Sequence, residues 1–269
     1  TVWAGLAAWS SVVPLYSAYH VLRLVVLGAG LLVMWNSEQT AAGIILPIIL
    51  QFVGQAVVGI LQVWVQGSVG LARLGELALD PQVSGVSVVG IHGSRFLRAY
   101  GLTDHPNLLG GGLAVGLAVF CGWVIGKKRS PRGLLGAGAL AGVGLAALAV
   151  TFSRSGWLAL AAGLGAAGAL YAARKDWAAL RQGGWVALAA CIVAFPAAWQ
   201  VRGLLGTRLN VAFNQKATAS LPSSITERLV LLDNAAEMIA ARPLTGVGLG
   251  GFPAALQDRR PGFPFDYQP

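Results

Sequence analysis

The chain has 269 residues, of which 56% are hydrophobic and 11% are charged, and its mean hydropathy is +0.68. A soluble domain carries about 25% charged residues, so this composition excludes an ordinary soluble protein. The net charge of +9 comes from lysines and arginines at the ends of apolar runs, a distribution that orients a membrane protein and does not form a nucleic-acid-binding face.

Six apolar runs predict helices that cross a membrane. Each approaches or exceeds the ~18 residues that span a ~30 Å hydrocarbon core as helix. The runs are too long for the strands of a barrel, and helices satisfy their own backbone hydrogen bonds in lipid. We therefore expect an all-α, polytopic transmembrane bundle, with residues 1–18 as an interfacial or loop segment. The predicted spans are at about 19–35, 42–65, 107–125, 133–152, 157–173 and 184–201.

Two short basic connectors predict the orientation of the bundle. By the positive-inside rule both face the cytoplasm. Alternation then places the Ser153–Gly156 turn outside, together with the long polar stretches 66–106 and 202–269. We expect a transmembrane domain over 1–201, with 66–106 as its outer loop, followed by an extracytoplasmic loop over 202–269. The connector residues are Lys127, Lys128, Arg129 and Arg132 in the first, and Arg174, Lys175 and Arg181 with Asp176 in the second.

The polar stretch before the third span contains Arg98, His105 and Asn107. A guanidinium fork can bind phosphate, and a histidine titrates near neutral pH. The alternative is an interfacial anchor, in which Asn107 caps the span and the arginines meet lipid headgroups. Both interpretations stay open for Arg98, and the anchor is favoured for Arg95.

The hairpin from Thr151 to Trp157 has room for little except Arg154. A cation so close to hydrocarbon is costly, which favours a functional role. The alternative is snorkelling of Arg154 to the interface beside Trp157.

An amphipathic helix is predicted at about 226–241. Ser224 and Glu227 match a capping box, and apolar residues recur along one face. Arg228 falls in the first turn, where the helix dipole disfavours a cation, so a bound anion explains this arginine better than stability does.

No signature of a cofactor or a metal is found in the sequence. The G-x-G-x-x-G spacing that begins at Gly246 follows a predicted helix and not a strand, so it is not a dinucleotide fingerprint. The two cysteines are far apart, and the three histidines lack ligand spacing. We expect neither a cofactor nor a metal.

Three segments together resemble the O-antigen ligase/polymerase superfamily of bacterial membrane glycosyltransferases. They are Arg98–Asn107, Ser153–Gly156, and Arg228 followed by the Ala241–Gly248 stretch. The resemblance implies a GT-C-like helical domain that, without a metal, moves a glycan from an undecaprenyl-pyrophosphate carrier to an acceptor. It implies a site on the outer face of the bacterial cytoplasmic membrane, and leaves the acceptor open between lipid A core, a growing polysaccharide and a protein.

The same resemblance assigns roles to residues. Arg154 and Arg228 are expected to be catalytic, by holding the pyrophosphate and stabilising its charge as the sugar leaves. Arg98, His105 and Asn107 are expected to bind substrate. The family's essential histidine has no match before Pro269, so we expect a truncated fragment with that histidine a little further on.

A transporter or flippase of a lipid-linked or anionic substrate is the rival interpretation. Transporters place polar groups or broken helices near the midplane, whereas here only Arg23 and Gln51 interrupt the apolar spans. This contrast favours the enzyme. A purely structural subunit leaves Arg154 and Arg228 unexplained.

Overall fold

The computed structural model describes residues 2–38, 40–83, 85–91, 94–127, 129–206 and 224–259. Two compact units make up the chain: Thr1–Gln39 with Lys216–Pro269, and Thr40–Gln215. The first contains α1 (Val2–Trp9), α2 (Pro14–Asn36), α9 (Ser224–Ala241) and α10 (Phe252–Arg259). The second contains α3 (Ala41–Val65), the 3-10 turn η1 (Ala72–Leu74), β1 (Val88–Ile91), β2 (Ser94–Leu97), α4 (Pro106–Ile125), α5 (Pro131–Val150), α6 (Arg154–Ala173) and α7 (Trp177–Gln200).

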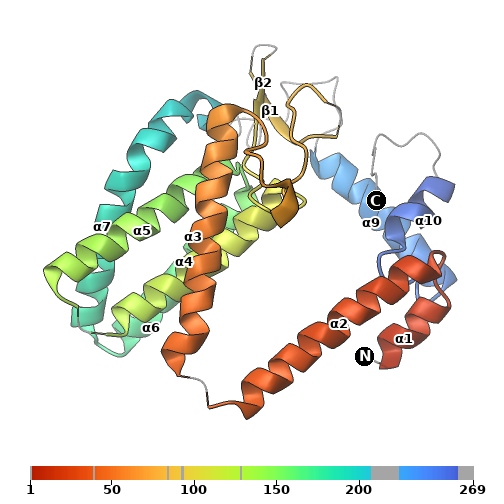
Figure 1. The fold of residues 1–269 in the computed structure, drawn as a ribbon, viewed down its shortest axis with the longest axis horizontal. Coiled ribbons are helices and arrows are strands. Elements are labelled where there is room, and N and C mark those ends of the chain that lie inside the picture. Colours follow the sequence, from red (N-terminus) through yellow and green to blue (C-terminus); the bar gives the residue numbers. More distant parts are fainter. Residues whose placement is uncertain are drawn as a thin grey trace. The chain divides into compact units, whose positions relative to one another are not determined.

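Six helices among the described residues, α2 to α7, are long and apolar enough to cross a membrane. They fall at the six predicted places, and the all-α, polytopic fold class is confirmed (Figure 1). Several ends are corrected, because start signals extend helices beyond their apolar runs. α7 begins at Trp177 and not at 184, since the Asp176 side chain caps it by accepting from the Ala179 N–H at 3.0 Å. Residues 2–9 and 14–18 are helical, where we expected an interfacial or loop segment.

Close packing of α5 against α7 forms much of the core of the second unit. A Cβ added to Gly142 would lie 2.5 Å from the Cβ of Val193, so only glycine lets the backbones approach this closely. Gly138, four residues earlier and so on the same face of α5, also lies against α7. Gly116 of α4 faces Phe52 of α3, whereas nothing lies near Gly112.

A short antiparallel hairpin, β1–β2, lies within residues 66–106, which we expected to be an outer loop. Val88 pairs with Leu97, and Gly90 pairs with Arg95. β2 leads into a segment in which Leu97 and Ala99 are fully buried. The hairpin therefore carries the Arg98 region into the protein and not along its surface.

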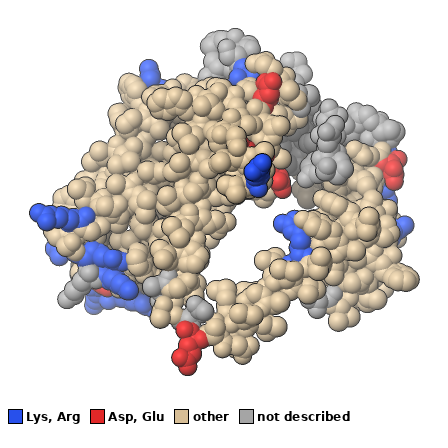
Figure 2. All heavy atoms as spheres, in the orientation of Figure 1, with Lys and Arg blue, Asp and Glu red and all other residues tan. Residues whose placement is uncertain are grey.

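The two basic connectors lie at the same end of the second unit. One joins α4 to α5 and the other joins α6 to α7, and Figure 2 shows lysines and arginines gathered there. Arg129 stacks on Trp123, with 4.4 Å between its guanidinium carbon and the ring centroid. The end of α3, the start of α4 and the turn between α5 and α6 lie at the opposite end, which is where the candidate site is built.

Candidate active site

Arg98 is the centre of a buried group of hydrogen bonds at this end of the bundle. The residue is only 5% exposed. Its Nε donates to the Thr151 carbonyl at 2.7 Å, and its terminal nitrogens donate to Ser87 Oγ and Asn107 Oδ1, each at 2.8 Å. The planar fork thus ties together the loop before β1, the first turn of α4 and the end of α5.

The turn between α5 and α6 packs directly on the start of α4. The Ser153 hydroxyl caps α6 by accepting from the Gly156 N–H at 3.3 Å. A Cβ added to Gly110 would lie 2.6 Å from the Ser153 Cβ, and one added to Gly156 would lie 2.9 Å from the Gly110 carbonyl oxygen. The two glycines therefore let this turn lie against α4 without an intervening side chain.

Arg154 is the first residue of α6, and not part of an open hairpin loop as predicted. Its side chain is half-buried, while the neighbouring Ser155 is exposed. The first turn of a helix has free N–H groups and a partial positive charge, so a cation there adds to a field that attracts anions. Thr151 and Ser153, both fully buried in the turn before α6, hold this helix start in place.

His105 is the N-cap of α4. We had considered Asn107 as this cap, but Asn107 is already the second residue of the helix. His105 Nδ1 accepts from the Asn107 N–H at 3.1 Å, and the Asn107 side chain turns to Arg98. Burial lowers the pKa of His105, and the positive charge of Arg98 lowers it further. The imidazole is therefore neutral at pH 7, as its acceptor role at Nδ1 requires.

Tyr100 lies beside these groups, with its ring centroid 6.4 Å from that of His105. Its hydroxyl accepts from the Ser87 N–H at 2.6 Å. Burial raises the pKa of Tyr100, so the phenol is protonated at physiological pH.

Of the five residues predicted to form the site, the structure brings together Arg98, His105 and Asn107, and Arg98 bonds to the turn that precedes Arg154. Arg228 lies in the first turns of α9, close to its predicted place, but its side chain is outside the described residues. Arg95, for which the anchor was favoured, donates to the carbonyls of Pro81 and Val83 and so holds a neighbouring loop.

Three glutamines, two on α3 and one at its C-cap, are the part of the site that the sequence did not lead us to predict. Gln55 Oε1 accepts from the Leu102 N–H at 2.7 Å, and Gln66 Oε1 accepts from the Leu97 N–H at 2.8 Å. Gln62 lies between them and is fully buried. The spacing of seven residues places Gln55 and Gln62 on one face of α3, a signal that was readable in the sequence, and Gln66 follows as the C-cap of the helix. The statement that only Arg23 and Gln51 interrupt the spans is therefore wrong.

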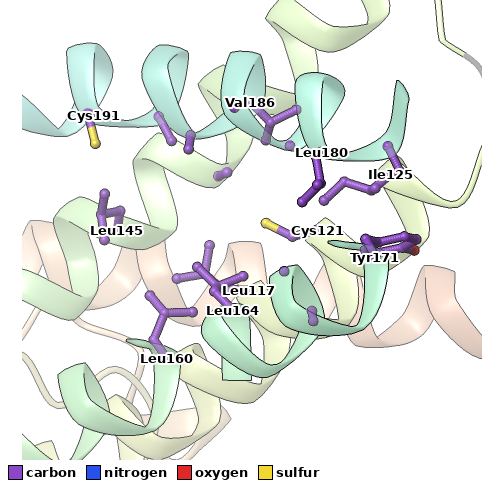
Figure 3. Close-up of a pocket in the computed structure, with 18 residues that line it drawn as sticks. Leu117, Cys121, Ile125, Leu145, Leu160, Leu164, Tyr171, Leu180, Val186 and Cys191 are labelled. Atoms are coloured by element: carbon purple, nitrogen blue, oxygen red, sulfur yellow. The ribbon is translucent and has the colours of Figure 1, made fainter. Parts of the chain in front are cut away.

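A cavity of about 360 Å³ lies between α4, α5, α6 and α7, away from these polar groups. Figure 3 shows Leu117, Leu160 and Leu164 around it, with Leu145 and Val186 on the facing helices. Apart from one tyrosine hydroxyl and two thiols, its lining side chains are apolar. The cavity offers no charged group to hold a phosphate. Within the described part of the chain, no three His, Cys, Asp or Glu side chains gather as a metal site would require.

Comparison with known proteins finds a family match over the C-terminal part of the chain. The family described as O-antigen ligase matches residues 139–268, a segment that includes Arg154 and Arg228 but not Arg98, His105 or Asn107. No curated protein and no solved structure matches the chain. The family implies a lipid-linked glycan and an acceptor as substrates. The six apolar helices among the described residues and this match indicate a multi-pass membrane protein, and the match supports membership of the O-antigen ligase/polymerase superfamily, whose general activity is glycan transfer.

Proposed function

We propose that the protein transfers a glycan from an undecaprenyl-pyrophosphate carrier to an acceptor at the outer face of the bacterial cytoplasmic membrane. The observation that carries the proposal is Arg154 at the start of α6, inside the segment that matches the family and held by a fully buried turn. Lipid A core, a growing polysaccharide and a protein are the acceptor classes that the family resemblance leaves open.

The proposed role of the arginines follows from the negative charge of the leaving pyrophosphate. When the bond between the sugar and the pyrophosphate breaks, negative charge develops on the leaving phosphate oxygens. A guanidinium fork that is already positioned stabilises this charge without reorganising, and it can contact two oxygens at once. Arg154 and Arg228 are proposed to do this, and Arg98, His105 and Asn107 to form the neighbouring part of the substrate site. In this scheme the arginines supply the positive charge that a metal supplies in other phosphate sites.

The distribution of basic residues along the bundle supports a site at the outer face of the membrane. The basic connectors and the turn between α5 and α6, which precedes Arg154, lie at opposite ends of the second unit (Figure 1). If the positive-inside rule holds, the Arg154 turn faces away from the cytoplasm, where a lipid-linked glycan would be presented.

The transporter interpretation gains no support from the helices. α3 and α7 contain Pro47 and Pro196, yet both continue through these residues as single helices. A broken helix at the midplane, the usual feature of a transporter site, is not seen in α2 to α7.

Changing Arg154 or Arg228 to alanine in the full-length protein tests the function. Both variants should lose surface glycan attachment or polymerisation, while immunoblots of membranes show normal insertion. Lysine should restore little activity, because an ammonium group cannot form the two parallel hydrogen bonds of a guanidinium.

Arg73→Ala is the matched control, because Arg73 is an exposed arginine at the same end of the second unit. This variant should retain wild-type glycan levels. Wild-type glycan in both the Arg154→Ala and Arg228→Ala strains would remove the proposed function.

A further inference from the structure

A buried amide connects the end of α3 to the segment after β2, which carries Arg98. Gln62 is fully buried and uses its whole hydrogen-bonding capacity. Its Nε2 donates to the Gly101 carbonyl at 2.8 Å and to Glu76 Oε1 at 3.0 Å. Its Oε1 accepts from the N–H groups of Gly101 at 2.8 Å and Tyr100 at 3.1 Å. The backbone at Tyr100 and Gly101 is therefore held by one side chain.

Glu76 determines which way this amide faces. It is 7% exposed, and its oxygens also accept from the Val69 N–H at 2.7 Å and the Leu71 N–H at 2.6 Å. An ionised carboxylate can only accept hydrogen bonds, so it requires the NH₂ end of Gln62 to face it. The oxygen of Gln62 must then face Tyr100 and Gly101.

The held backbone leads directly to the turn before Arg154. The Ala99 N–H, two residues before Gly101, donates to the Val150 carbonyl at 3.0 Å. Arg98 then donates to the Thr151 carbonyl, as described above. Two successive residues of the segment after β2 thus bind two successive carbonyls at the end of α5. A shift of this segment must therefore move the turn as well.

We propose that Gln62 and Glu76 are positioning residues for glycan transfer, which set the Arg154 helix start through the Tyr100–Gly101 backbone and Arg98. This inference rests on the proposed function, in which Arg154 binds the diphosphate. Neither residue is assigned a contact with substrate.

Two substitutions break the network in different ways. Glu76→Gln places an NH₂ group against a backbone N–H, since the carboxylate accepts on both oxygens. Gln62→Met keeps a similar volume but removes all four hydrogen bonds. A displacement of about 1 Å in a catalytic group can cost about 100-fold in rate. We expect kcat to fall about 10- to 100-fold in each variant, with the KM for a lipid-linked glycan donor changed by less than about threefold.

Gln51→Leu is the control. Gln51 is a second amide on α3, but it is exposed and makes no hydrogen bond to other described residues. Its kcat and KM should equal those of the wild type. Equal values in Glu76→Gln and Gln62→Met would overturn the proposal.

Hydrogen–deuterium exchange of the full-length protein in nanodiscs tests the same coupling without relying on activity. Both variants should exchange faster over residues 97–102 and also over 151–156, while the α5–α7 contact around residues 138–146 keeps its protection. Unchanged exchange at 151–156 would overturn the proposal, and so would faster exchange throughout the bundle, because the network would then only support the fold. If the wild-type protein transferred no glycan, the proposed function would be wrong, whereas the exchange data would still decide whether the network sets the turn.

Discussion

Arg98 shows that the environment of an arginine in the folded chain can differ from the one that its sequence suggests. The residue is 5% exposed and donates to Thr151, Ser87 and Asn107. An arginine in these contacts does not reach lipid headgroups, so the anchor interpretation is wrong for it. Substrate binding by Arg98 stays a prediction. A buried cation left without its partners is strongly destabilising, which makes this side chain important for the site whether or not it contacts substrate.

Glu76 yields a prediction about pH. Burial acts to raise the pKa of Glu76, but hydrogen bonds from Gln62 and from the N–H groups of Val69 and Leu71 outweigh it and hold the pKa below the usual value of 4.5. A carboxyl whose pKa is lower in the folded state stabilises the protein above its unfolded pKa, and this stability is lost as pH falls through the folded pKa.

Thermal unfolding in detergent between pH 7 and pH 3 measures this effect. The Tm difference between the wild type and Glu76→Gln should be largest at neutral pH and should shrink as the pH falls below about 4.5. A difference that stays constant across this range would contradict the role of the ionised carboxylate.

At the scale of elements, the site depends on where helices begin and how closely they approach. α4 begins at a histidine cap, α6 begins at a serine cap, and Gly110 and Gly156 let the second start pack on the first. Ser153, in the α5–α6 turn, would meet any side chain placed at position 110. The position of Arg154 is therefore set by helix ends and by glycine contacts, and not by the hairpin sequence alone.

Gly110→Ala tests this contact. The added methyl would lie 2.6 Å from Ser153 Cβ, so either α4 or the turn must move. We expect a loss of about 1–3 kcal/mol in the free energy of unfolding, measured by denaturant titration in micelles, together with reduced glycan transfer.

Gly111→Ala provides the comparison at the next position of the same helix, because nothing lies within 4 Å of its added Cβ. This variant should be neutral or slightly more stable, since alanine favours helix over glycine by about 1 kcal/mol. Equal stability of the two variants would show that the close contact has no energetic importance.

At the scale of the whole molecule, the arrangement of charge along the spans predicts one topology. Lys127 and Lys175 belong to the two connectors at one end of the second unit, and Ser155 is an exposed residue in the first turn of α6, at the other end. If the proposed function is correct, Ser155 faces the outside of the cytoplasmic membrane.

Single cysteines at these exposed positions test the topology after Cys121 and Cys191 are replaced by alanine. A membrane-impermeant maleimide added to spheroplasts should label Ser155→Cys, and should label Lys127→Cys and Lys175→Cys only after the membrane is permeabilised. Labelling in the reverse pattern would place the Arg154 turn in the cytosol and remove the proposed outer site.

The sequence by itself determined the class of the fold, the six spans and the placement of both basic connectors at one end of the bundle. These features depend on local composition, because hydrocarbon accepts only long apolar helices and connector charges sort by side. Only the tertiary structure decided that His105 caps α4, that a hairpin buries Arg98, and that Gln62 holds the Tyr100–Gly101 backbone. Most of these polar groups find partners tens of residues away, and which partner satisfies each buried donor or acceptor depends on how the helices pack.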